Sequence, residues 1–317
     1  MKKKVLITGG SGLLAVNWAL SIRDEYEVTL LLHQRKIYLK GVKTDIANIS
    51  SLDECKAVLD RHKPDVVIHT AGLTSVEKCE ENPNLAQEVN VDLAKNIAIA
   101  CDKQNVKLVH ISTDHLFSGE GSFVTEESNA TPINNYAKTK LEGERQVQKN
   151  CKDALIIRTN FFCWGTKYRQ SFSDFIISKL RNNESIDLFS DVFFTTILAE
   201  ELAQKVHQLI DAKASGVFNV VGSECMSKYE FGVKLANCFG LDANLINEIS
   251  INDKPNLVKR PKDMSLSNKK ICKTLNCKMP SIDEQLQTLK QQESDSGINH
   301  IRTDIIPYGR HYIDEDD

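Results

Sequence analysis

Residues 5–15 read VLITGGSGLLA, an apolar run that passes through a glycine-rich turn into a helical pattern. In such a turn Gly9 permits the tight bend and Gly12 lets the backbone approach a pyrophosphate closely, while small Ala15 permits close packing of helix on strand. The N–H groups at the start of the helix then face the phosphates. The stretch predicts a dinucleotide site, and a turn without a ligand is the alternative. The expected contacts are Gly9, Ser11, Gly12, Leu13 and Leu14.

Outward from this stretch, short β-branched runs alternate with longer helical patterns, which is typical of a parallel sheet with crossover helices. Continuous apolar strands of this kind are buried on both faces. The sequence predicts an α/β fold: a doubly wound parallel sheet of the Rossmann type, with ligands at the carboxyl edge of its strands. Strands are expected at 5–8, 28–32, 66–69, 108–112 and 155–158, and helices at 13–23, 52–62 and 85–104.

The regular alternation ends after Arg158, where aromatic side chains crowd into a short span. We expect an NADP-binding domain over residues 1–165 and a smaller C-terminal substrate-binding lobe over residues 166–317. A helix at 198–210 and a strand at 217–221 indicate that a segment near 191–221 returns to the first sheet. Residues 291–317 are polar and end in acidic side chains, so a solvated tail without catalytic residues is expected there.

The composition excludes several classes of protein. A hydrophobic content of 41% and a charged content of 26% are typical of a globular chain, and a net charge of −3 without a basic patch argues against a nucleic-acid partner. Glycines interrupt the apolar run after Lys4, which excludes a signal peptide, and no apolar stretch is long enough to cross a membrane. Nine cysteines without paired spacing indicate reduced thiols, a cytoplasmic location and no metal site.

The end of the second predicted strand bears on the choice of cofactor. An NAD enzyme would place Asp or Glu there for the ribose 2′-hydroxyl, but this chain has HQRK at residues 33–36. Cations suit a 2′-phosphate, so NADP is expected, with Arg35 as the main contact and His33 next. A solvated basic loop is the alternative. Asp45 and Ile46 follow the next short strand and are expected near the adenine.

Tyr136 and Lys140 form the candidate catalytic pair, because residues four apart share one face of a helix. A phenol is a poor acid at neutral pH, and an adjacent cation lowers its pKa toward the working range. Ser112 and Thr113 stand upstream at the end of a predicted strand, where Thr113 could bind a substrate carbonyl through a hydrogen bond. Thr113, Tyr136 and Lys140 are therefore the candidate catalytic residues.

Together with the glycine turn, this order and spacing resemble the extended short-chain dehydrogenase/reductase family over nearly the whole chain. The resemblance implies that Thr113 and Tyr136 polarise a carbonyl, while Lys140 binds the nicotinamide ribose and tunes the Tyr. Within that family, PDVVIHTAG at 64–72, VEKCE at 76–80, STDHLF at 112–117 and Arg260-Pro261 are similar to dTDP-4-dehydrorhamnose reductases. NADPH, a nucleotide-linked 4-keto-6-deoxy sugar and reduction of that sugar are thus implied. The further cofactor contacts implied are Thr70, Ala71, Gly72, Ser112, Tyr136 and Lys140.

Two positions depart from the pattern of rhamnose reductases, because His115 stands where Tyr is usual and Phe161 where Trp is frequent. Both are expected to touch the sugar, so the substrate is expected to differ from dTDP-4-keto-rhamnose; plain packing is the alternative role of His115. Arg260 is a candidate for the phosphates of the nucleotide, with a surface salt bridge as the alternative. The substrate contacts expected are Thr74, Asp114, His115, Phe161, Trp164 and Arg260.

Other activities stay open. A 4,6-dehydratase would carry Asp-Glu after the catalytic Thr, and Asp114-His115 lacks the second carboxylate. A nucleotide-sugar epimerase with tightly held NAD is a further alternative, although the cations at 33–36 argue against NAD. Residues 216–245, with MSKYE at 226–230, are also similar to the regulatory β subunit of methionine adenosyltransferase, which keeps the fold as a binding partner. A homodimer is compatible with the sequence.

Overall fold

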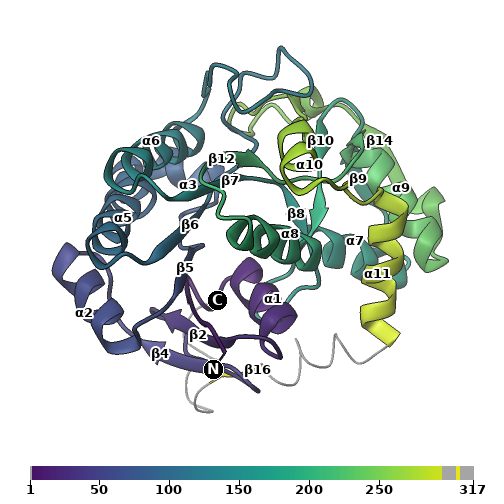
Figure 1. Ribbon diagram of the computed structural model, residues 1–317. Helices are drawn as coiled ribbons and strands as arrows, with labels where there is room; N and C mark the ends of the chain where they lie inside the picture. The colour runs from purple at the N-terminus through teal and green to yellow at the C-terminus, as the bar shows by residue number, and fades with distance from the viewer. Residues whose placement is uncertain (1, 295–304, 308–317) are drawn as a thin grey trace.

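The structure is a computed structural model that describes residues 2–294 and 305–307. At its centre lies a seven-stranded sheet in the order β12-β7-β6-β5-β1-β2-β4, and every neighbouring pair in it is parallel (Figure 1). The predicted α/β fold is confirmed. The strands are β1 Lys4–Thr8, β2 Glu27–Leu32, β4 Lys43–Ile46, β5 Val66–His69, β6 Lys107–Ile111, β7 Leu155–Arg158 and β12 Gly216–Asn219.

Helices cover both faces of this sheet, which explains why its strands are apolar throughout. Side chains alternate between the faces, so Leu6 packs toward one helical layer while Val5 and Ile7 pack toward the other. The first layer holds α2, α5 and α6, and the second holds α1 and α8 (Figure 1). The bounds are α1 Leu13–Ile22, α2 Leu52–His62, α5 Leu93–Gln104, α6 Asn135–Asn150 and α8 Ala199–Asp211.

The helix expected at 85–104 is divided into α4 Pro83–Gln87, the π-helical turn η1 Glu88–Asp92, and α5; α3 Val76–Glu81 precedes them. The π turn places buried Asn90 against the chain that follows β5. Its side chain accepts a hydrogen bond from the Leu73 N–H at 2.8 Å and donates to the Leu73 carbonyl at 3.1 Å and to Thr139 Oγ1 at 3.1 Å. Asn90 therefore fixes the loop after β5 relative to α6, a use typical of π turns near functional sites.

The chain returns to the first sheet at β12. β12 lies beside β7, with Val217 opposite Ile156, and α8 packs on α1. The division of the chain near residue 165 stays a prediction.

The remaining elements form a second lobe, which Figure 1 shows beside the sheet on the side of α7, α9 and α11. Phe231 is fully buried there, and the rings of Phe162, Phe172 and Phe194 surround it. Within this lobe β10 pairs with β13 and β15, and β9 pairs with β14. The bounds are β8 Phe161–Phe162, α7 Phe172–Arg181, β9 Ile186–Phe189, β10 Phe193–Thr195, β11 Ile197–Leu198, β13 Cys225–Ser227, α9 Lys228–Phe239, η2 Ala243–Leu245, β14 Ile246–Ile249, η3 Ile251–Asp253, β15 Asp263–Met264, α10 Lys269–Leu275 and α11 Ile282–Ser294.

The C-terminal segment differs from the solvated tail expected from residue 291 onward. α11 continues to Ser294, and Arg181 forms an ion pair with Glu293 at 2.6 Å. The short strand β16 Ile305–Pro307, which is apolar, pairs antiparallel with β3 Ile37–Leu39, so backbone pairing ties this segment to the chain after β2. Residues 295–304 and 308–317 lie outside the described residues.

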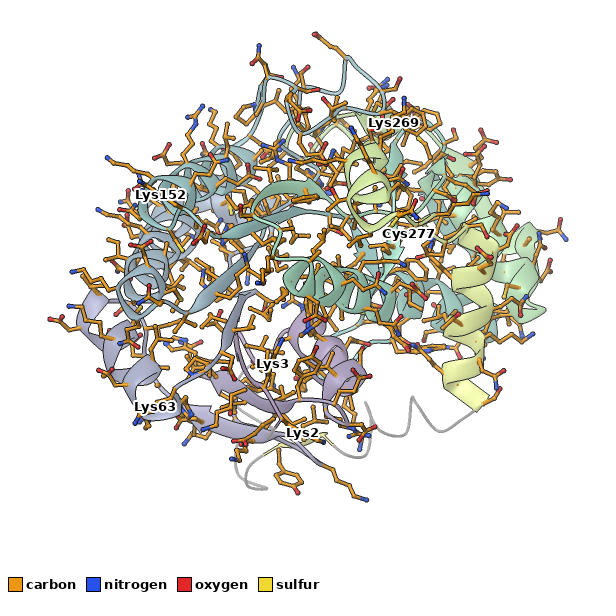
Figure 2. The ribbon with its side chains drawn as sticks, in the orientation of Figure 1. Lys2, Lys3, Lys63, Lys152, Lys269 and Cys277 are labelled. Carbon is orange, nitrogen blue, oxygen red and sulfur yellow. The ribbon has the colours of Figure 1, made fainter. Side chains whose placement is uncertain are left out.

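Figure 2 labels lysines in different parts of the molecule, such as Lys63 after α2 and Lys152 after α6. All nine cysteines are free, and among the described residues no group of three or more His, Cys, Asp or Glu could hold a metal. A search of the same residues finds no helix with the length and hydropathy of a membrane span.

Candidate active site

A cavity of about 920 Å³ runs along the carboxyl ends of β1, β2, β5 and β6 and reaches the second lobe. The carboxyl edge of a doubly wound sheet is where such folds bind ligands, because the crossovers separate there. The predicted residues that line it are Gly9, Ser11, Gly12, Leu13, Leu14, His33, Arg35, Thr70, Ala71, Gly72, Thr74, Ser112, Thr113, Asp114, His115, Tyr136, Lys140, Phe161 and Arg260.

The backbone of the glycine turn leaves room for a ligand to approach closely. Gly9 has a left-handed φ of 65°, a conformation that residues with a side chain rarely adopt. A Cβ there would also lie 2.9 Å from the backbone of Ala71, so steric contact excludes a side chain as well. Gly12 is the residue before α1, and no side chain caps that helix. The first N–H groups of α1 are therefore left for an anion at the cavity wall. This backbone fits the pyrophosphate of a dinucleotide.

Two residues expected near the adenine do not line the cavity. Asp45 and Ile46 belong to β4 itself and do not line the cavity. The Asp45 carboxylate binds Arg61 at 2.6 Å and His62 at 2.7 Å, so helix α2 satisfies its charge. The side chains that follow β4 take its place along the cavity, namely Ala47, Asn48, Ile49 and Ser50. Strand β4 extends through Ile46, two residues further than the sequence suggested. The residues that line the cavity therefore come later in the chain.

The candidate catalytic pair, Tyr136 and Lys140, lies at the start of α6. The Asn134 side chain caps this helix by accepting from the Ala137 N–H at 2.8 Å, and it donates to the Lys259 carbonyl at 3.0 Å, which ties the helix start to the second lobe. Tyr136 and Lys140 are both buried on one helical face. The Lys140 ammonium donates to the Ile111 carbonyl at the end of β6, at 2.7 Å. Both side chains thus face the cavity from one fixed helix.

The acid–base properties of the pair differ from expectation. Burial raises the Tyr136 pKa above its usual value of 10.0, and a hydrogen bond with the Thr113 side chain acts in the opposite direction without cancelling it. The Lys140 ammonium donates its hydrogen bond to the Ile111 carbonyl and not to the phenol oxygen. Burial also lowers the pKa of Lys140 to about 8. At neutral pH the phenol therefore holds its proton, as a proton donor must.

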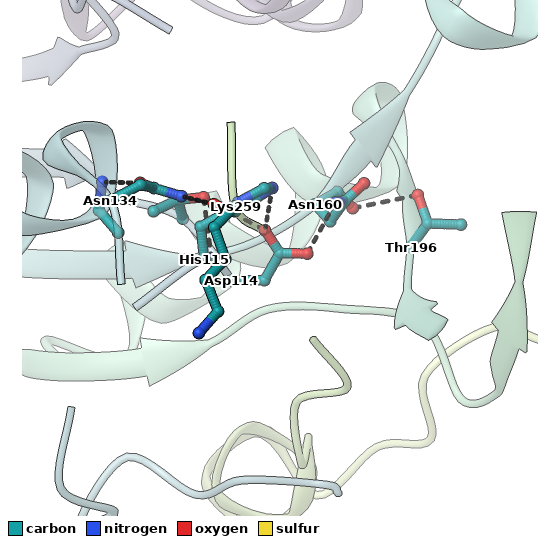
Figure 3. Close-up of polar contacts among 8 residues, drawn as sticks. Asp114, His115, Asn134, Asn160, Thr196 and Lys259 are labelled. Atoms are coloured by element: carbon teal, nitrogen blue, oxygen red, sulfur yellow. Dashed lines mark hydrogen bonds and ion pairs between the residues drawn. The ribbon is translucent and has the colours of Figure 1, made fainter. Parts of the chain in front are cut away.

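Asp114 connects the catalytic strand to the second lobe. It accepts a hydrogen bond from Thr113 Oγ1 at 3.2 Å and another from the Asn160 side chain at 2.7 Å, and the Asn160 carbonyl accepts from Thr196 Oγ1 at 3.1 Å (Figure 3). Asp114 is 2% exposed. This chain of contacts holds the Thr113 hydroxyl at the cavity wall.

His115 lies beside the catalytic tyrosine, with its ring edge-on to Tyr136 at 5.6 Å between centroids. Burial lowers the His115 pKa, although the neighbouring Asp114 carboxylate acts in the opposite direction. Its Nδ1 is buried and has no hydrogen-bond partner among the described residues. A neutral imidazole with a free nitrogen at the cavity wall is suited to contact a sugar hydroxyl.

Arg260 lines the cavity, and a second cation, Lys228, lies near Asp114. Arg260 forms an ion pair with Glu77, yet its buried Nε has no partner among the described residues. Lys228, the first residue of α9, was missed by the sequence reasoning. Its ammonium lies 3.4 Å from the centroid of the Phe194 ring, and burial lowers its pKa to about 8, while the Asp114 carboxylate acts the other way. Only the fold brings Lys228 near Asp114, so no local signal could have indicated it.

Trp164 was expected at the substrate and is not there. Its side chain is fully buried, and its Nε1 donates to the Leu289 carbonyl of α11 at 2.9 Å. Trp164 packs the second lobe because the chain turns inward after Phe162. Three cavity residues that the sequence reasoning did not identify are Asn160, Tyr168 and Arg169.

The parallel sheet, the glycine turn and the Tyr-x-x-x-Lys pair on one helix define an extended short-chain dehydrogenase/reductase fold. A family model described as the RmlD substrate binding domain matches residues 3–294, so the chain belongs to that family.

Individual relatives agree with this assignment. The chain is 29% identical over 91% of its length to a probable low-salt glycan biosynthesis reductase of Haloferax volcanii, of which 98% is covered. It is 27% identical over 85% of its length to the methionine adenosyltransferase 2 subunit beta of Rattus norvegicus, of which 81% is covered. A crystal structure of dTDP-4-dehydrorhamnose reductase from Bacillus anthracis in complex with NADP superposes with a TM-score of 0.81, at 25% identity, over 92% of this chain and 100% of that one.

Proposed function

We propose that this protein is an NADPH-dependent reductase of a nucleotide-linked 4-keto-6-deoxy sugar. One observation carries the proposal: Thr113, Tyr136 and Lys140 line the same cavity as the glycine turn. Relatives whose names describe reductases, and the dTDP-4-dehydrorhamnose reductase structure in complex with NADP, support it. His115 and Phe161 also line the cavity, which supports a sugar other than the rhamnose precursor.

In the proposed reaction the bound NADPH supplies the hydride that adds to the keto carbon. Tyr136 donates its phenolic proton to the carbonyl oxygen, so the ketone becomes an alcohol and the phenolate recovers a proton from solvent. Thr113 orients the carbonyl oxygen when its hydroxyl proton turns from Asp114 Oδ1 to that oxygen. Lys140 binds the nicotinamide ribose and, while charged, stabilises the phenolate formed in the step.

Arg260 at the cavity and Lys228 near Asp114 suit the nucleotide. Arg260 has a buried Nε without a hydrogen-bond partner among the described residues, and the Lys228 ammonium contacts the face of the Phe194 ring at 3.4 Å. Buried donors without acceptors indicate an acceptor-rich, anionic ligand. We assign the diphosphate of the substrate to them.

The test is NADPH oxidation against a panel of nucleotide-linked 4-keto sugars, with the Tyr136→Phe variant beside the wild type. The variant should bind NADPH as tightly as the wild type and lose turnover by roughly 100-fold or more, because only proton donation is removed. Undiminished turnover would show that Tyr136 has another role.

A second candidate is a non-catalytic NADP-binding subunit, favoured by the likeness to the methionine adenosyltransferase subunit over most of the chain. Tight NADPH binding without turnover of any sugar on the panel, together with copurification of a catalytic partner, would favour it. An epimerase would convert substrate without net loss of NADPH.

A further inference from the structure

A short hairpin of the second lobe crosses the cofactor end of the cavity. Thr166 and Arg169 close it through two backbone hydrogen bonds of 2.9 and 3.4 Å. The Tyr168 hydroxyl donates to the Ser11 carbonyl in the glycine turn at 2.9 Å, and the Arg169 guanidinium donates to Thr74 Oγ1 at 3.3 Å. The hairpin 166–169 thus touches the loops after both β1 and β5.

Arg35 reaches the same hairpin from the end of β2. Its guanidinium carbon lies 4.6 Å from the centroid of the Tyr168 ring, and among the described residues it has no hydrogen-bond or ion-pair partner. An exposed arginine without a partner loses considerable side-chain entropy when it binds a ligand. A guanidinium stacked on a ring is already held in place, while its N–H edge stays free for an anion.

One side chain therefore connects two anion sites. Tyr168 binds the glycine turn, where a pyrophosphate would lie, through its hydroxyl, and it holds Arg35 through its ring. We propose that Tyr168 is a positioning residue that sets the cofactor preference, because its ring holds the Arg35 guanidinium where the 2′-phosphate of NADPH binds. This inference rests on the proposed use of NADPH.

The test measures dissociation constants for NADPH and NADH by fluorescence titration of the full chain and four variants. Tyr168→Leu removes the ring and should lower the preference for NADPH over NADH about fivefold. Tyr168→Phe keeps the ring and loses the hydroxyl, so both constants should shift together and the preference should stay. Arg35→Gln should lower the preference roughly tenfold or more. In Tyr168→Leu/Arg35→Gln the Tyr168 change should add nothing further to that loss.

Two outcomes separate this inference from the proposed function. If Arg35→Gln lowers the preference but Tyr168→Leu weakens both cofactors equally, Tyr168 is only structural, and the inference is overturned while NADPH use stands. If Arg35→Gln leaves the preference unchanged, the assignment of Arg35 to the 2′-phosphate fails together with the inference. Should Tyr168→Leu fold poorly by thermal unfolding, Tyr168→Met provides the same comparison, because it also lacks a ring.

Discussion

At the scale of single residues, burial keeps the Tyr136 phenol in its neutral form. The phenol pKa is raised above its usual value, so the proton is present at physiological pH for the proposed donation. Lys140 is charged only below a pKa of about 8, so a loss of its charge at alkaline pH should weaken phenolate stabilisation. In the proposed reaction, proton donation and charge stabilisation thus belong to different side chains of one helix.

Lys228 offers a residue-scale prediction about the substrate. Lys228→Met should weaken binding of a free nucleoside diphosphate about tenfold, because one charged hydrogen bond is lost, while NADPH binding stays unchanged. Isothermal titration with dTDP and UDP measures this. Lys234→Met is the matched control, because Lys234 lies on the same helix but pairs with Asp283 at 2.9 Å on an exposed face. Equal affinities for the wild type and Lys228→Met would remove Lys228 from the site.

At the scale of elements, β5 and β6 place two histidines inside the sheet. His69 and His110 stack at 5.4 Å between centroids, and neither nitrogen of His110 has a partner among the described residues. Burial is the main cause that lowers both pKa values, that of His69 to about 3. In the unfolded chain both would titrate near 6.5, so the unfolded state takes up more protons as the pH falls, and stability is lost between about pH 6.5 and 3.

We expect His110→Phe to flatten this acid dependence. Between about pH 7 and 5 the wild type should lose on the order of 2 kcal/mol more free energy of unfolding than the variant. Urea unfolding at the two pH values gives the difference, and His33→Gln, at an exposed position, should behave as the wild type. Parallel pH dependences for the wild type and His110→Phe would contradict the account.

A buried ion pair joins α6, which carries the catalytic pair, to β7. Arg158 Nη2 lies 2.8 Å from Glu144 Oε2, and both side chains are almost fully buried. Glu144→Ala should cost about 3–5 kcal/mol of unfolding free energy, because it leaves a buried guanidinium without its partner. Glu142→Ala, which removes an exposed pair with Arg145 at 3.6 Å, should cost less than about 1 kcal/mol. Equal losses in urea unfolding would show that burial of the pair is unimportant.

The sequence predicted well those features that depend on local periodicity. The strands at 5–8, 66–69 and 155–158 and the helix at 52–62 agree with the structure, because their apolar pattern reflects burial along one element. The π turn at Glu88–Asp92 was missed, because one extra residue in a helix leaves the overall hydrophobic pattern nearly unchanged.

At the scale of the whole molecule, the site lies where the sheet edge meets the second lobe. The positions of Thr113 and Tyr136 at the cavity could be predicted because each residue stands in a recognisable local motif. Tyr168 at the cavity and Lys228 near Asp114 could not, since only the packing of the second lobe brings them there. Trp164 is the opposite case. It was expected to contact the substrate, but its side chain packs in the core of the second lobe.

Transfer of deuterium from 4-deuterated NADPH to a nucleotide-linked 4-keto sugar tests the central claim most directly. Mass spectrometry and NMR of the product should show one deuterium on the former keto carbon, with one NADPH consumed per alcohol formed, and Tyr136→Phe should slow this transfer strongly. Tight NADPH binding with no deuterium in any sugar, or conversion of the sugar without consumption of NADPH, would contradict the assignment as a reductase.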